Sequence, residues 1–202
     1  WYSAARILGG FFTALTLGTV RGWVASRFWV VETLLRPITA VIKATPVASF
    51  IILVLLWFSG KNLSVIISML MVFPVIYMNV LEGIRSADKK LLEMAQVFRL
   101  SVGKKLLYIY LPAVAPFFAS ACSVSLGLCW KSGIAAEVIG TPDGSIGAVF
   151  YQAKIFLQTS ELLAWTVVVV AVSVAFEKLF MFLLRLVLKK LKMEDVLNGK
   201  RA

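Results

Sequence analysis

The sequence predicts an all-α, polytopic bundle of membrane-spanning helices. Hydrophobic residues make up 60% of its 202 residues, whereas soluble domains contain about 45–50% apolar residues. Charged residues account for only 15% of the chain, and they fall between long apolar runs. Several of those runs reach the roughly 20 residues that a helix needs to cross the hydrocarbon of a bilayer. Spanning helices separated by polar loops explain all three observations.

Five segments are long and apolar enough to cross a membrane. They cover residues 3–23, 37–58, 62–84, 106–130 and 162–188. Each segment is too long and too uniformly apolar for an amphipathic helix on the surface of a soluble protein. The whole chain, residues 1–202, is therefore expected to form a single transmembrane domain.

Basic residues gather in three regions that alternate with the five spans. These are the loop after the first span, the loop after the third span (85–105) and the C-terminal tail, with Arg21, Arg27, Arg36, Arg85, Lys89, Lys90, Arg99, Lys104, Lys105, Lys189, Lys190, Lys192, Lys200 and Arg201. The positive-inside rule places all three regions, and so the C-terminus, in the cytoplasm. Trp1 would then lie outside, and we expect a sixth span upstream of it.

The charge and the reactive residues exclude several classes of function. A net charge of +11 is compatible with nucleic-acid binding, but the basic residues flank apolar runs, which fits lipid headgroups, and no nucleic-acid recognition motif accompanies them. The chain has no histidine. Its two cysteines, Cys122 and Cys129, lie within an apolar run and are interpreted as small packing residues. Neither a metal site nor a disulfide is expected.

Residues 131–161 are too polar to span a membrane and too long for a simple turn, so we expect an extracytoplasmic loop. A turn is predicted at 141–144, followed by a short helix over 146–157 whose apolar residues share one face. This helix lies along the outer surface or caps the bundle. Glu137 is a candidate for gating or docking, and Lys131 is a candidate for attracting an anion along the pathway; a packing role for this segment stays open.

The loop between the third and fourth spans has the most informative pattern. Asp88 can cap a helix, and Ser101 can cap a second one that enters the next span. Between them Leu91, Leu92, Ala95 and Phe98 form an apolar stripe at helical spacing. Such a stripe either binds a partner surface or packs back on the protein's own helices, and the spacing alone leaves both open.

The spacing in this loop resembles the conserved cytoplasmic loop of ABC importer permeases. That pattern reads Glu-Ala-Ala, three residues, Gly, nine residues, Ile, one residue, Leu-Pro, and this chain matches it at Glu93, Ala95, Ile109, Leu111 and Pro112. It departs from the pattern at two positions, where Met94 replaces the second-position alanine and Arg99 replaces glycine. Neither departure removes the helix, but Arg99 puts in question a turn that depends on glycine.

The resemblance extends over essentially the whole chain. Residues 46–60, with their Trp-Phe-Ser-Gly end, are similar to a conserved stretch of the nitrate, sulfonate and taurine branch of these permeases. Phe73-Pro74 and the segment 130–140 fit the same branch. The resemblance implies a multi-pass permease subunit in a bacterial inner membrane, which forms the translocation pathway for a small solute. Nitrate, sulfonates, taurine and vitamin precursors are all carried by such permeases, and the residues do not choose among them.

The resemblance also implies the partners and the coupling site. In this family the loop helix docks in a groove of a separate cytoplasmic ATPase, which holds the ATP and Mg, so the chain itself needs no cofactor and catalyses no reaction. Leu91, Leu92, Ala95 and Phe98 would supply the docking surface and Glu93 a polar anchor. Arg99 and Ser101 are assigned to the same coupling site. A solute-binding protein would deliver the solute. A second permease copy or a paralogue would complete the pathway.

Two other functions fit the sequence less well. A membrane enzyme needs a nucleophile with a base, or a metal cluster, inside the bundle, and the chain has no histidine and no clustered acids. A secondary transporter predicts internal repeats and carboxylates at midplane, and no clear repeat is present. The chain also contains no Gly-x-x-x-x-Gly-Lys-Ser/Thr loop, which fits a permease whose ATPase is a separate protein.

Overall fold

The computed structural model describes residues 1–190, and every regular element in that range is a helix. The helices are α1 Tyr2–Arg27, α2 Trp29–Ala44, α3 Val47–Trp57, α4 Gly60–Arg85, α5 Lys89–Val97, α6 Val102–Lys105, the π-helical turn η1 Leu106–Tyr110, α7 Leu111–Gly140, α8 Ile146–Ile155 and α9 Thr159–Lys190. The all-α prediction is confirmed for the described part of the chain.

Four helical stretches in the described range are long and apolar enough to cross a membrane. They are α1, α4, the continuous stretch Val102–Gly140 that joins α6, η1 and α7, and α9. The pair α2 and α3 makes a fifth candidate, although its two halves are bent by 108° at the break between them. The polytopic architecture therefore stands, with four spans or, counting the bent pair, five.

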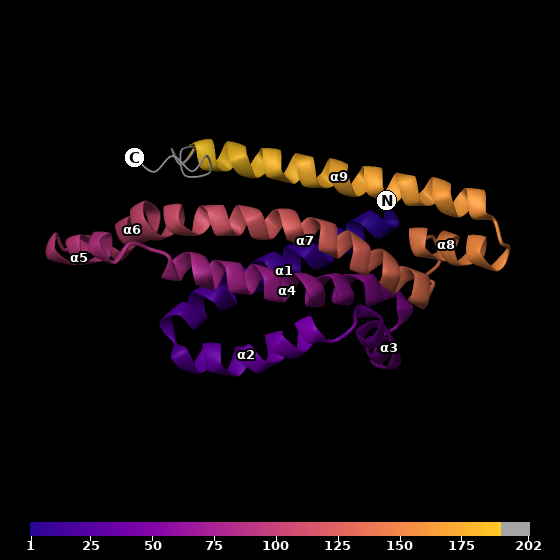
Figure 1. Cartoon of the computed structure of the whole chain (residues 1–202), viewed down its shortest axis with the longest axis horizontal. Coiled ribbons are helices and arrows are strands. Elements are labelled where there is room, and N and C mark those ends of the chain that lie inside the picture. Colours follow the sequence, from indigo (N-terminus) through magenta and orange to yellow (C-terminus); the bar gives the residue numbers. More distant parts are fainter. Residues whose placement is uncertain (191–202) are drawn as a thin grey trace.

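The centre of the bundle is built from α1, α4 and α7, with α9 on one side and α2 on the other (Figure 1). Glycines on one face of α1 allow its backbone to approach α4 very closely. A Cβ atom added at Gly10 would lie 2.5 Å from the carbonyl oxygen of Val65, and one added at Gly18 would lie 2.9 Å from the Ile76 side chain. Small residues at such spacing allow membrane helices to pack through their backbones, where lipid offers no hydrophobic driving force.

The span expected at residues 37–58 differs from the structure, because this segment is not one continuous helix. α2 begins earlier, at Trp29, and ends at Ala44, and the chain then turns through 108° into α3. Pro46 explains the break, since a proline disfavours helical backbone in the residue before it. Thr45 accordingly has the extended angles φ −81° and ψ 133°. Average hydropathy does not register such a break.

The extracytoplasmic loop expected at residues 131–161 is also different, because residues 131–140 continue α7. These residues can be small and polar because protein surrounds them: Ser132, Gly133 and Glu137 are all buried. A Cβ atom at Gly133 would lie 2.5 Å from the Cγ1 atom of Ile7 on α1. The helix ends at Gly140, and the next residue, Thr141, has a left-handed φ of 39°. The short helix predicted at 146–157 is present as α8, which starts where predicted and ends two residues earlier, at Ile155.

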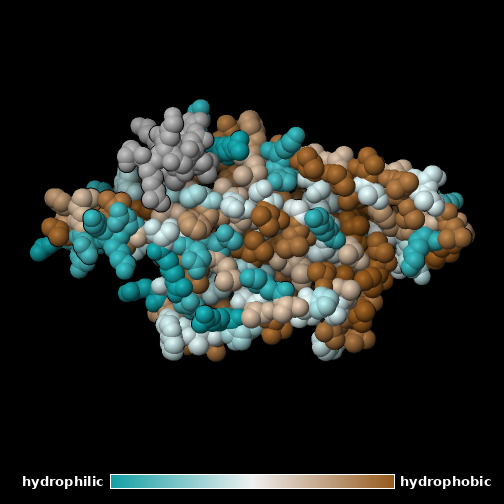
Figure 2. All heavy atoms as spheres, viewed as in Figure 1, coloured by the Kyte–Doolittle hydropathy of each residue, from teal (hydrophilic) through white to brown (hydrophobic). Residues whose placement is uncertain are grey.

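The helix ends that carry basic residues gather at one end of the bundle. The last turns of α1, α4 and α9 lie there together with α5 and the start of α6 (Figure 1), and hydrophilic residues cluster at the same end (Figure 2). The predicted basic regions therefore share one side of the bundle as far as the chain is described. Lys192, Lys200 and Arg201 lie outside the described residues.

Candidate functional site

α5 stands at one extremity of the molecule, beyond the ends of α4 and α7 (Figure 1). Its first turn is capped as the sequence predicts, because the Oδ1 atom of Asp88 accepts a hydrogen bond from the backbone N–H of Lys90 at 2.8 Å. An aspartate at this position satisfies an otherwise unpaired N–H and also interacts favourably with the helix dipole. α5 is thus a short helix with a defined start on an exposed part of the fold.

One side of α5 packs on the chain itself. Ala95 is completely buried and lies in a small apolar cluster with Ala87 and Ile109, and Leu92 and Leu100 pack against the same cluster. This cluster attaches α5 to the end of α4 and to the start of the fourth span. Half of the predicted apolar stripe, namely Leu92 and Ala95, therefore serves packing within the subunit.

Next to this packed strip, α5 presents further apolar side chains to the exterior. We call Leu91, Met94, Val97 and Phe98 the outer face; their exposed fractions are 43%, 48%, 79% and 73%. Leu91 and Phe98 belong to the predicted stripe, whereas Met94 and Val97 were missed. The signal for Met94 was its position three residues after Leu91 and four before Phe98. Glu93 is also exposed, on the polar side of the helix with Gln96.

α5 ends in a left-handed turn at Arg99, the position where related loops carry glycine. Arg99 has a φ of 49°. The N–H of Leu100 donates to the carbonyl of Ala95 at 2.9 Å, and the N–H of Arg99 donates to that of Gln96 at 3.1 Å. This pair of bonds defines a Schellman motif, which usually places glycine at the left-handed residue. The turn that Arg99 put in question is therefore formed without glycine.

Replacing Arg99 with glycine should stabilise α5. A left-handed backbone costs a residue with a Cβ atom about 1–2 kcal/mol, and glycine removes that cost. We expect the amides of α5 to exchange with solvent about fivefold more slowly in Arg99→Gly, which corresponds to about 1 kcal/mol. Hydrogen exchange followed by mass spectrometry measures this. Arg99→Val, with a β-branched side chain, should accelerate exchange; equal rates in all three proteins would contradict the assigned strain.

The end of the predicted motif connects α5 to the fourth span. Ser101 occupies the N-cap position of α6 as expected, but its side chain makes no capping hydrogen bond within the described residues. Ile109 lies in η1, where the N–H of Leu111 bonds to the carbonyl of Leu106, five residues back. Pro112 follows at the second residue of α7; it has no N–H to donate to the preceding turn, and that turn is the π-helical η1. This arrangement makes a continuous helical connection from Val102 into the membrane.

Glu137 lies at a buried junction of four helices, far along α7 from α5. Its Oε2 atom accepts hydrogen bonds from the Ser3 hydroxyl of α1 at 2.6 Å and from the Gly147 N–H of α8 at 3.3 Å. The Ser3 hydroxyl in turn accepts the N–H of Ile146 at 2.9 Å. The first two N–H groups of α8 are therefore satisfied by α1 and α7, and a carboxylate there also complements the dipole of α8. Ser64 of α4 is buried beside the same group.

This geometry separates the two candidate pathway residues. Glu137 is fully buried, whereas Lys131 is exposed on another face of α7. The structure does not bring their side chains together. Ser3 and Gly147 were missed as partners of Glu137, and nothing in their spacing could have indicated them, because they lie 134 and 10 residues away along the chain.

Comparison with known proteins identifies the family. The sequence profile described as "Binding-protein-dependent transport system inner membrane component" matches residues 7–193. The chain belongs to this family. The matched range includes α5, the outer face, Glu137 and Gly147, and it begins after Ser3, so the outer face and most of the Glu137 junction belong to the family's common region.

Relatives within the permease family are named for several solutes. The "Putative aliphatic sulfonates transport permease protein SsuC" of Bacillus subtilis is 30% identical over 173 residues, which is 85% of this chain and 62% of the relative. The "Taurine transport system permease protein TauC" of Escherichia coli is 27% identical over 87% of this chain and 64% of its own length. The chain thus spans somewhat less than two thirds of these two relatives.

A solved structure has the same fold. The chain titled "Crystal structure of an amino acid ABC transporter with histidines" superposes with a TM-score of 0.64 at 16% identity, covering 93% of this permease chain and 91% of the other. The overlap supports the helical arrangement described above.

Proposed function

We propose that this chain is the permease subunit of a bacterial ABC importer, and that the outer face of α5 couples it to a separate cytoplasmic ATPase. The observation that carries the proposal is the division of α5 into a packed side and an exposed apolar side. Ala95 and Ile109 fix the helix to the spans, while Val97 and Phe98 face outward with exposed fractions of 79% and 73%. An apolar helix face on a polar end of the molecule favours insertion into the groove of a partner protein.

The rest of the proposal follows from family membership and from the fold. The end of the bundle that carries α5 and the last turns of α1, α4 and α9 (Figure 1) would face the cytoplasm, because those last turns carry Arg27, Arg85, Lys189 and Lys190. ATP and Mg would be bound by the ATPase, and a solute-binding protein would deliver the solute at the opposite end. One copy supplies half of a pathway, so two copies would form the transport unit. The named solutes of the relatives, aliphatic sulfonates and taurine, limit the proposal to a small solute.

The coupling role is tested by co-purification with a candidate ABC ATPase from the same genome. We expect the wild-type permease to retain the ATPase, and Phe98→Asp and Val97→Asp each to reduce retention at least tenfold, since each places a charge in the apolar interface. Gln96→Asp is the matched control: it adds the same charge to an exposed position on the polar side of α5 and should retain the ATPase.

Two results would decide against this role. Equal retention by wild type, Phe98→Asp and Gln96→Asp would remove the outer face from the interface. Retention by none of them would remove the ATPase as a partner. Leu92→Asp is not a docking variant, because Leu92 packs on the protein's own cluster; it should instead reduce the yield of folded permease, measured by size-exclusion chromatography of the membrane extract.

A further inference from the structure

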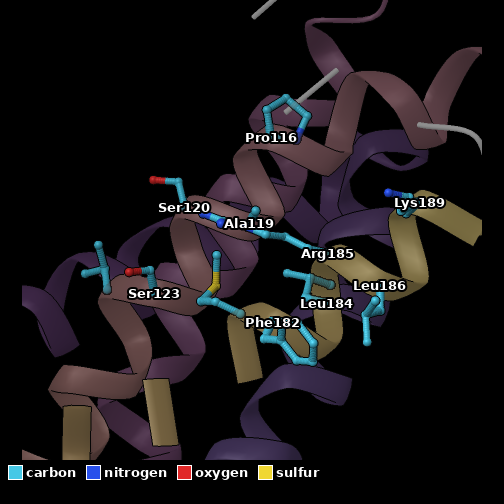
Figure 3. A pocket seen from close by; sticks show the side chains of 11 residues that line it. Pro116, Ala119, Ser120, Ser123, Phe182, Leu184, Arg185, Leu186 and Lys189 are labelled. Carbon is cyan, nitrogen blue, oxygen red and sulfur yellow. The ribbon is translucent and has the colours of Figure 1, made fainter. Parts of the chain in front are cut away.

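Basic side chains line a hollow on each flank of the central helices. Between α7 and α9 the lining includes Arg185 and Lys189 (Figure 3), and Lys189 already has an interaction partner within the protein. The other hollow has a volume of about 420 Å³, within the range of sites that bind small ligands. It lies between α2 and α4 and is lined by Arg36, Thr39, Ala40, Lys43, Ala44 and Met78. None of these lining residues is acidic.

The spacing along α2 brings two cations and a small residue to this hollow. Ala40 is four residues after Arg36 and three before Lys43, so the three side chains share one face of the helix. Arg36 and Lys43 are about 10.5 Å apart along the helix axis at 1.5 Å per residue. Both side chains are long enough to reach a group held above Ala40, whose single methyl group leaves that space open.

Neither cation has an anionic partner among the described residues. The Nζ atom of Lys43 lies 3.9 Å from the Sδ atom of Met78, which is a neutral acceptor. The carboxylate of Glu32, one turn before Arg36 on α2, is bound by the guanidinium of Arg85. The positive charge at the hollow is therefore not balanced by a side chain in the described part of the chain.

The same kind of ligand would balance this charge whether lipid or water lies outside α2. α2 and α3 together form a candidate span, and a charge within a span is costly without a charged partner or water. Glu82 on α4 is exposed and forms no ion pair with a described residue. Phospholipids offer phosphate oxygens, and an aqueous pathway offers soluble anions. A guanidinium binds such oxygens at two points, and an ammonium adds a point charge.

We propose that the hollow between α2 and α4 binds one oxyanion, held between Arg36 and Lys43 above Ala40. The phosphate of a phospholipid and a small soluble oxyanion share this chemistry. The site recognises the charged oxygens, and the experiment below separates the two sources. The proposal rests neither on the coupling role of α5 nor on the identity of the transported solute.

Two titrations of the purified protein in detergent test the site. Native mass spectrometry compares binding of phosphatidylglycerol with that of zwitterionic phosphatidylcholine, and thermal unfolding compares sulfate with chloride at equal ionic strength. We expect a preference for the oxyanion in at least one titration, and at least tenfold weaker binding in Arg36→Gln/Lys43→Gln. The matched control, Arg21→Gln/Arg27→Gln, removes the same charge from exposed positions of α1 that do not line the hollow. It should bind within twofold of wild type.

The two titrations also identify the source of the oxyanion. A phosphatidylglycerol preference that the double variant loses, without an effect of sulfate, assigns the site to a lipid headgroup. Stabilisation by sulfate that the double variant loses assigns it to a soluble anion. Ala40→Trp keeps both charges but fills the hollow; it should also weaken binding, and it decides the matter if the double variant does not fold.

Three results overturn the proposal. The first is equal binding by wild type and the double variant, and the second is no preference for the oxyanion in either titration. The third is disulfide crosslinking of Ala40→Cys between two copies, which makes this face a subunit contact. The native cysteines, Cys122 and Cys129, are buried and do not obscure that readout.

Discussion

Replacing Gly147 with leucine is expected to lower the free energy of unfolding by about 3 kcal/mol or more, because α8 sits directly against α7 at this residue. A Cβ atom at position 147 would lie 2.3 Å from the Cβ atom of Glu137 and 2.4 Å from its carbonyl carbon. Overpacking of ordinary cores costs about 1–3 kcal/mol, and here the obstacle is backbone that cannot rotate away. Thermal unfolding of the purified permease in detergent measures the loss.

Gly127→Ala provides the control for this substitution. Gly127 lies on the same helix as Glu137, and no described atom outside its own stretch of helix lies within 4 Å of the added Cβ atom. Since alanine is a better helix former than glycine by about 1 kcal/mol, this variant should be as stable as wild type or slightly more stable. If Gly147→Leu unfolds at the same temperature as Gly127→Ala, the close approach of α8 to α7 is not a requirement of the fold.

Replacing Glu137 with alanine should have the second largest effect, about 3 kcal/mol of lost stability. The Ser3 hydroxyl and the Gly147 N–H would both lose their acceptor in a buried place, and each unpaired group costs about 1–3 kcal/mol. Glu137→Gln keeps an acceptor oxygen and should lose about 1 kcal/mol. The order wild type, Gln, Ala in unfolding temperature is therefore the expected result.

Substitution of an exposed glutamate is the control that shows whether the loss of stability is specific to the Glu137 junction. Glu82 lies on the exposed side of α4, and Glu82→Ala should unfold like wild type. Should Glu137→Gln lose as much stability as Glu137→Ala, the negative charge rather than the hydrogen bonds would hold the junction together. Unchanged stability in both would leave Glu137 without a structural role and return it to consideration as a gate.

Hydropathy located the helices well where their residues are uniformly apolar, and poorly where small or polar residues are buried by other helices. The spans predicted at 62–84 and 162–188 agree within three residues with α4 and α9. The end of the fourth span was placed ten residues early, because Gly133 and Glu137 are buried by other helices and need not be apolar. Pro46 was visible in the sequence, but a proline inside a span is often tolerated, so the 108° bend it accompanies could not be predicted.

Site residues that lie close together in the sequence could be predicted, and contacts between residues far apart in the sequence could not. Helical spacing and the motif found α5, its Asp88 cap and the stripe, because neighbours along a helix are neighbours in space. Which half of that stripe faces inward depends on Ile109, which lies on the next helical segment, and only the fold supplies that contact. The partners of Glu137 come from three other helices, and no single sequence records such contacts.

The glycine face of α1 restricts how the subunit can change shape. At Gly10 the two backbones are close enough that an added Cβ atom would lie 2.5 Å from a carbonyl oxygen of α4, and at Gly22 it would lie 2.9 Å from the side chain of Val80. One helix cannot slide past the other by a turn without first separating, because larger residues would have to cross these contacts. α1 and α4 therefore move together as one rigid unit. Any rearrangement during a transport cycle must take place where other segments connect to this unit, such as the bend at Pro46 and the attachment of α5.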